Sequence, residues 1–102
     1  MKSFAERALE EARLVMLQAL KSQASGSLPV SLFRDALEVE GHIYSNDRIR
    51  TELRALQELG VLKLIAYGET PFSIAELTER GADFLSRRII VDGIKRPEFR
   101  GA

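Results

Sequence analysis

Arginines one helical turn apart are the residues of this 102-residue chain whose spacing could do recognisable chemistry. Arg50 and Arg54 are four positions apart, so a helix would point both guanidinium groups the same way. Guanidinium groups bind guanine edges and phosphates, and Asn46 in the same segment could bind an adenine or a phosphate. The predicted DNA-contacting residues are therefore Asn46, Arg48, Arg50, Thr51, Arg54 and, on the strand that follows, Lys63. The alternative is a solvated helix face with ion pairs, such as Arg48 with Glu52.

The overall charge of the chain does not support DNA binding. Fifteen basic and fifteen acidic side chains sum to a formal net charge of zero, so nucleic-acid binding would have to come from local clustering. Basic residues do gather towards the C-terminal end, and a merely solvated surface also fits them. The length and the 45% hydrophobic content predict one domain over residues 1–102. Because cysteine is absent, we expect neither disulfides nor thiolate metal sites, and a cytoplasmic location.

Catalysis has little support in the sequence. His42 is the only histidine, and it is predicted to lie at the surface in a turn beside Gly41. The chain has no phosphate-binding glycine loop, nucleophile motif or set of metal ligands, so we expect no enzyme activity, no cofactor and no metal. No apolar run is long enough for a membrane span, and the charged residues of the first segment do not fit a signal peptide. The expectation is a soluble protein without a membrane partner.

The helix that would carry the arginines is well delimited. Ser45 is predicted to cap it, and Asp47 lies in its first turn, where the helix dipole favours negative charge. Gly60 is placed for a left-handed C-terminal cap, which gives a helix over residues 45–59. Its predicted buried stripe follows intervals of four and three residues: Ile49, Leu53, Leu56 and Leu59.

Two helices are predicted to precede this one. The first spans residues 3–22 and begins with a capping box formed by Ser3 and Glu6. Its apolar residues exceed one face, so we expect it to contact both its own core and a second copy of the chain. A connector over residues 22–27 leads to a short extended piece at 28–30. Ser31 then starts a short helix whose inward residues are Leu32, Phe33, Ala36 and Leu37.

A β-hairpin and a last helix are predicted to follow. Residues 61–66 and 71–77 are the two arms, and the short tip between them carries Glu69, which weakens a role in a DNA groove. Thr78 is predicted to cap a helix over residues 79–90, with Ala82, Leu85 and Ile89 inward. A glycine inside a helix costs about 1 kcal/mol relative to alanine. We expect Gly81 to stand there because the helix must pack closely behind the preceding strand.

This order of elements is the layout of a winged helix-turn-helix, an α+β fold that is mainly α with a small β-hairpin. The stretch "SNDRIRTELRALQELGVLKLI" resembles the recognition helix and first wing strand of winged-helix regulators. "IAELTERGADFL" is similar to the junction between wing and last helix in the MarR, PadR and ArsR-like groups, with Thr78, Gly81 and Leu85 at the matching positions. The resemblance covers residues 28–90 and implies double-stranded DNA as the partner, with helix 45–59 as the recognition helix.

The C-terminal segment carries a second resemblance. "LTERG" together with "VDGIKRP" looks like a small family of winged-helix proteins of Mu-like phages and prophages, although "FLSRRII" is bulkier and more basic than that pattern. Residues 1–27 would be the N-terminal helix and connector, and 91–102 a tail. The apolar residues of the tail predict packing on its own domain or on a partner subunit, and a basic phosphate-binding arm is the rival interpretation.

Two functions follow as hypotheses. The first is a homodimeric DNA-binding protein, paired through the N-terminal helix and the C-terminal segment, that regulates transcription or acts in phage DNA transactions. The second is a non-catalytic protein-protein interaction module of phage origin. The arginine-bearing helix face favours the first, and the zero net charge favours the second.

Overall fold

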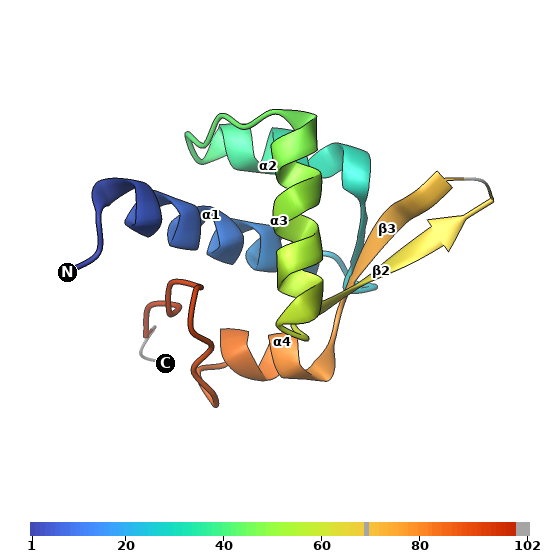
Figure 1. The fold of residues 1–102 in the computed structure, drawn as a ribbon. Coiled ribbons are helices and arrows are strands. Elements are labelled where there is room, and N and C mark those ends of the chain that lie inside the picture. Colours follow the sequence, from blue (N-terminus) through green and yellow to red (C-terminus); the bar gives the residue numbers. More distant parts are fainter. Residues whose placement is uncertain (69, 100–102) are drawn as a thin grey trace.

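Helices surround one end of a three-stranded antiparallel sheet (Figure 1). The computed structural model describes residues 1–68 and 70–99, without the side chains of residues 67 and 70–73. The elements in chain order are α1 (Phe4–Lys21), β1 (Ser27–Pro29), the 3-10 turn η1 (Val30–Leu32), α2 (Phe33–Val39), α3 (Asn46–Glu58), β2 (Leu62–Tyr67), β3 (Thr70–Leu77) and α4 (Glu79–Leu85). Among the described residues, no helix is long and apolar enough to cross a membrane.

The arrangement is the winged helix-turn-helix that the sequence predicts, an α+β fold. A turn joins α2 to α3, and the β2–β3 hairpin, the wing, follows α3 directly and extends away from the helices (Figure 1). The short extended piece is strand β1, which pairs with β3 from Ser27 opposite Glu76 to Pro29 opposite Ile74. The sheet order β1-β3-β2 makes β3 the central strand, so the hairpin is fixed to the body of the domain.

Local capping explains where the helices begin. The side chains of Ser3, Ser45 and Thr78 each accept a hydrogen bond at 3.1 Å from the backbone N–H three residues later. Each bond satisfies one of the donors that a helix leaves unpaired at its first turn. The three predicted starts are therefore confirmed. The predicted C-cap of α3 is confirmed as well, because Gly60 adopts the left-handed conformation at φ 80°.

The core forms where α1 packs against the other helices and the sheet. Its fully buried large side chains are Met16, Leu17, Leu20, Phe33, Leu37, Leu53, Leu56, Val61, Leu62 and Phe84. The prediction that Leu32 faces inward is wrong, because Leu32 is exposed. It belongs to the 3-10 turn η1, whose tighter winding turns it away from the face that Phe33 and Leu37 bury.

The close packing predicted at Gly81 is confirmed. A Cβ atom on Gly81 would lie 2.1 Å from the carbonyl oxygen of Val61 and 2.7 Å from Cδ1 of Leu77. The backbone after α3 therefore occupies the space where a side chain would stand. The hydroxyl of Thr78 also donates to the carbonyl of Gly60 at 2.6 Å. The start of α4 thus fixes the end of α3 and the root of the wing together.

Helix α4 is shorter than predicted, since it ends at Leu85 rather than near residue 90. Arg87 adopts a left-handed conformation with φ 65°. Its N–H bonds to the carbonyl of Phe84 at 3.0 Å, and the N–H of Arg88 bonds to that of Asp83 at 2.9 Å. This pair of bonds is the Schellman motif that terminates helices. The residue that anchors α4 is the fully buried Phe84, with Leu85 and Ile89 packed only in part.

The described part of the C-terminal segment packs on its own domain, in agreement with one of the two interpretations of the tail. Val91 and Ile94 are buried in the core, and the N–H of Lys95 donates to the carbonyl of Glu10 on α1 at 3.2 Å. The guanidinium of Arg87 donates to the carbonyl of Pro97 and lies over the ring of Phe99 at 5.8 Å. These interactions bring the segment back across α1.

Candidate nucleic-acid interface

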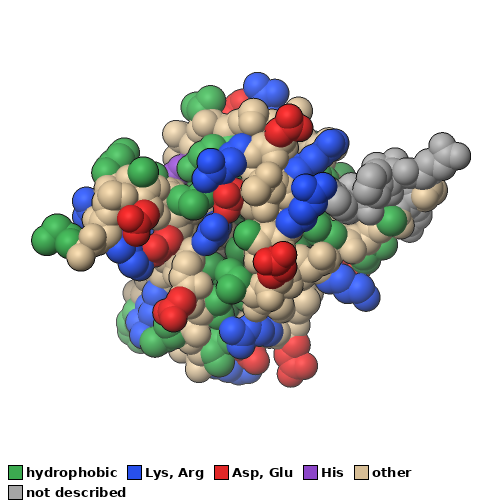
Figure 2. Space-filling view, in the orientation of Figure 1, with side chains coloured by type: hydrophobic (Ala, Val, Ile, Leu, Met, Phe, Trp, Pro, Cys, Tyr) green, Lys and Arg blue, Asp and Glu red, His purple; other side chains and the backbone are tan. Residues whose placement is uncertain are grey.

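The outward face of α3 is the surface where the predicted DNA-contacting residues stand. The stripe of Ile49, Leu53 and Leu56 is buried against the core, which turns the opposite face to solvent. The predicted helix residues are all exposed on this outward face: Asn46, Arg48, Arg50, Thr51 and Arg54. Figure 2 shows basic side chains along the flanks of α3, with acidic ones among them. The helix therefore presents them as the sequence predicts.

Glu52 departs from the prediction, because it is buried rather than on the outward face. Its residue surface is only 4% exposed. The Nε of Arg13 on α1 donates to its Oε1 at 2.8 Å, and the Nε of Arg48 donates to its Oε2 at 3.0 Å. A buried carboxylate is tolerated when it is paired in this way. The sequence pattern did indicate this burial, because position 52 lies three residues after Ile49 and four before Leu56, on the buried stripe.

The Glu52 network changes what Arg48 can offer. The ion pair of Arg48 with Glu52, predicted as the alternative to DNA contact, is confirmed. The half-exposed Arg48 uses its Nε in this pair, while a guanidinium carries five N–H donors in all. The network continues inward, because Nη1 of Arg13 donates to the carbonyl of Gly93 at 2.9 Å. Arg13 thus connects α3, through α1, to the C-terminal segment.

Thr51 is a weaker candidate than the arginines beside it. Its hydroxyl donates to the carbonyl of Asp47 at 3.1 Å, one turn earlier in α3. A hydroxyl has a single hydrogen, so Thr51 could donate to a phosphate only by giving up this bond. Asp47 itself places a carboxylate on the first turn of the helix. The outward face thus carries exposed cations at Arg50 and Arg54 together with the carboxylate of Asp47.

Lys63 stands apart from the helix residues, on strand β2. It is exposed, and it lies opposite Glu76 of β3 in the strand register, so a carboxylate lies beside it on the same sheet face. The strand is tied to α3 by Gln57, whose Oε1 accepts a hydrogen bond from the N–H of Leu64 at 2.8 Å. No pattern in the sequence indicates this bond. Glu69, expected at the wing tip, lies outside the described part of the structure.

His42 is less exposed than predicted. Its side chain is only 13% exposed, and its ring stacks on Tyr44 with centroids 6.4 Å apart and planes 6° apart. Its Nε2 lies 3.8 Å from Oε1 of Glu11 on α1. The predicted surface position is therefore correct only in part, because the turn brings the ring against α1. Within the described residues, no three His, Asp or Glu side chains gather so as to hold a metal ion.

Comparison with known proteins gives relatives but no function. No family model matches the chain, and no solved structure does. An uncharacterized protein of Haemophilus influenzae is 35% identical over 78 residues, which cover 76% of this chain and 74% of the relative. The uncharacterized protein gp26 of Escherichia phage Mu is 32% identical over 91 residues, which cover 89% of this chain and 92% of the relative. The chain therefore belongs to the same family as gp26 of phage Mu.

Proposed function

We propose that this protein is a non-catalytic, cytoplasmic DNA-binding protein that uses α3 as a recognition helix. One observation carries the proposal: in a winged-helix arrangement, the outward face of α3 exposes Arg50 and Arg54 one turn apart, next to the wing. An α-helix with its side chains is about 10–12 Å across, and the major groove is about 12 Å wide. The helix therefore has the size and the cations that the groove requires.

Each residue has a defined role in this proposal. Arg50 and Arg54 contact guanine edges or phosphates, and Asn46 reaches a base or phosphate at the start of the helix. Arg48 contributes the N–H groups that Glu52 does not use. Lys63 contacts the backbone from the root of the wing. The biological setting is transcription regulation or a phage DNA transaction, and the similarity to a phage Mu protein supports a phage origin.

Arginine substitutions on α3 test the proposal. We expect Arg50→Ala or Arg54→Ala to weaken binding to a preferred duplex by about 1–3 kcal/mol if the side chain reads a base. Fluorescence anisotropy with a labelled duplex measures the dissociation constant. Arg88→Ala is the matched control, because Arg88 is an exposed arginine that follows α4 in the chain and does not belong to α3. Equal losses of affinity in all three variants would contradict a recognition role for α3.

A second candidate function is a non-catalytic protein-protein interaction module. The observation that favours it is a set of large apolar side chains that remain exposed around one hollow: Phe4, Ile43 and Ile90. The zero net charge of the chain agrees with a protein partner. A failure to bind any duplex in the titrations would favour this candidate over DNA binding. The two functions use different faces, so one chain can carry both.

A further inference from the structure

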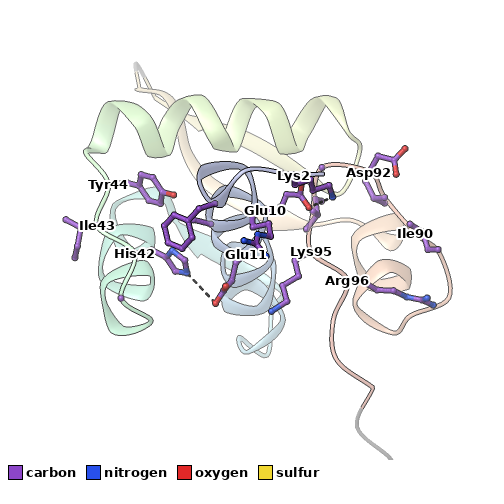
Figure 3. Close-up of a pocket in the computed structure, with 17 residues that line it drawn as sticks. Lys2, Glu10, Glu11, His42, Ile43, Tyr44, Ile90, Asp92, Lys95 and Arg96 are labelled. Atoms are coloured by element: carbon purple, nitrogen blue, oxygen red, sulfur yellow. Dashed lines mark hydrogen bonds and ion pairs between the residues drawn. The ribbon is translucent and has the colours of Figure 1, made fainter.

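An open groove lies between the N-terminal half of α1, the turn at residues 41–44 and the segment at residues 90–96. Its volume is about 1000 Å³. In Figure 3, His42 and Tyr44 stand on one wall, Asp92, Lys95 and Arg96 stand on the other, and α1 lies between them. The groove thus brings together three segments that are far apart in the sequence.

The rim of the groove is unusually apolar for a surface. Phe4 is 80% exposed, Ile43 is 73% exposed and Ile90 is 67% exposed, and all three line the groove. Single exposed apolar residues are common, whereas several around one depression mark a contact surface. The groove is also open and at the upper end of the volumes of small-molecule sites. A macromolecular surface suits it better than a small ligand.

The charges of the groove point to the kind of partner. Its lining includes four basic residues, Lys2, Arg7, Lys95 and Arg96, and three acidic residues, Glu10, Glu11 and Asp92. Lys2 donates to Oε1 of Glu10 at 2.7 Å, and this bond raises the pKa of Lys2, so that pair is already satisfied within one chain. A nucleic acid or a peptide of one charge sign would meet repulsion as well as attraction here. A surface that carries both signs can complement a rotated copy of itself.

We propose that the groove is where a second copy of this chain docks, with Phe4 of each copy inserted into the groove of the other. In a two-fold pair the same patch serves both copies, so projecting apolar side chains and a recess must occur on one face. Here Phe4, Ile43 and Ile90 project around the recess itself. The wing extends from the opposite end of the molecule (Figure 1), so this pairing leaves the wing uncovered. The inference goes beyond DNA binding and holds whether or not α3 binds DNA.

Sedimentation velocity over a range of protein concentrations tests the pairing. We expect a concentration-dependent dimer, and we expect Phe4→Glu or Ile90→Glu to raise its dissociation constant by about tenfold or more, as loss of a buried anchor does. Val39→Glu is the matched control, because Val39 is 83% exposed on α2 and does not line the groove. It should leave the dimer unchanged. Circular dichroism melting of each variant establishes that it is folded.

Charge exchange provides a test that a folding defect cannot imitate. One variant makes the groove more acidic, Lys95→Glu with Arg96→Glu, and a second makes it more basic, Glu10→Lys with Glu11→Lys. We expect each variant alone to self-associate more weakly than the wild type, and the mixture to form heterodimers in native mass spectrometry. The cysteine-free chain also accepts a single Phe4→Cys substitution for cross-linking with a thiol-reactive photoprobe. The cross-linked peptides should come from the groove of another copy.

Three results would overturn the proposal. The first is a wild-type protein that remains monomeric at every concentration. The second is a dimer that Phe4→Glu and Val39→Glu weaken equally, since the anchor would then lie elsewhere. The third is a cross-link from position 4 that reaches residues outside the groove. A wild-type dimer that fails to bind any duplex would contradict the DNA-binding function alone and would leave this inference intact.

Discussion

The outward face of α3 and the groove beside α1 are built in different ways. The face of α3 comes from one continuous segment, and its arginines follow the helical repeat. The groove is assembled from α1, the 41–44 turn and the 90–96 segment, so no local pattern describes it. One surface is polar with spaced cations, and the other is apolar with charges of both signs. A single small domain therefore presents two surfaces of different chemical character, one encoded locally and one assembled from distant segments.

The two surfaces nevertheless share their supports. Gly81 allows α4 to pack against Val61, directly after α3. Arg13 joins Glu52 of α3 to Gly93 of the C-terminal segment, which forms one wall of the groove. Substitutions at these supports should therefore disturb both surfaces, whereas substitutions at a helix cap should disturb only one. Substitutions at Gly81, Arg13 and Ser45 test this expectation.

The largest effect is expected from Gly81→Leu, which should lower the free energy of unfolding by about 4 kcal/mol. Even the first carbon of the new side chain would overlap the carbonyl of Val61 at 2.1 Å, so α4 would have to move. Both surfaces should then be disrupted together. Urea denaturation followed by circular dichroism measures the change.

Gly26→Ala is the control for Gly81→Leu. Gly26 has φ 71°, so alanine there suffers the left-handed strain of about 1 kcal/mol, but its Cβ would meet only Cβ of Leu77 at an ordinary 4.0 Å. If the two variants lose similar stability, close packing is not the reason for Gly81.

The next largest effect is expected from Arg13→Met, at about 3 kcal/mol of unfolding free energy. The substitution leaves the buried carboxylate of Glu52 with Arg48 as its remaining ion-pair partner from this network. It also removes the hydrogen bond that Arg13 donates to the carbonyl of Gly93. Arg34→Met is the control, since its exposed pair with Glu38 should contribute only a few tenths of a kcal/mol.

A double variant refines this prediction. Combining Arg13→Met with Glu52→Met removes the stranded charge, so it should recover part of the stability that the single variant loses. Chemical denaturation of the four proteins in this cycle provides the comparison. If the double variant instead loses as much stability as the two single variants together, Arg13 and Glu52 act independently.

The smallest effect is expected from Ser45→Ala, at about 1 kcal/mol. The substitution removes the cap bond to the N–H of Arg48, which lies at the first turn of α3 and far from residues 90–96 in the chain. Hydrogen exchange should accelerate in that turn and stay unchanged in residues 90–96. Ser31→Ala, an exposed serine in η1, is the control. Equal acceleration in both regions would mean that the surfaces are coupled more tightly than their separate construction suggests.

The features that the sequence predicted correctly are those that local chemistry determines. A serine or threonine cap, a glycine in a left-handed turn and the alternation of a hairpin each depend on residues a few positions apart. Ser45, Gly60 and Thr78 could therefore be assigned before the fold was known. The exposure of Arg50 and Arg54 followed from the same helical repeat.

The features that the sequence did not predict depend on residues distant in the chain. Glu52 is buried because Arg13, 39 residues earlier, supplies a counter-charge. Helix α4 ends early because Arg87 adopts a left-handed turn, and its guanidinium bonds to Pro97 ten residues later. Position 52 does lie on the apolar stripe of α3, but neither of these pairings with a distant residue has a local signature. The same reason explains why the groove, with walls from three segments, could be anticipated only as an interface between the N-terminal helix and the C-terminal segment.

The most direct test of the central claim, that α3 binds DNA, is the salt dependence of affinity for random and phage-derived duplexes. We expect the association constant to fall steeply as salt rises, because binding to phosphates releases counterions. We also expect Arg50→Ala with Arg54→Ala to reduce the slope by about one for each phosphate that the variant no longer binds. Binding that is undetectable, or that does not change with salt, would contradict the claim.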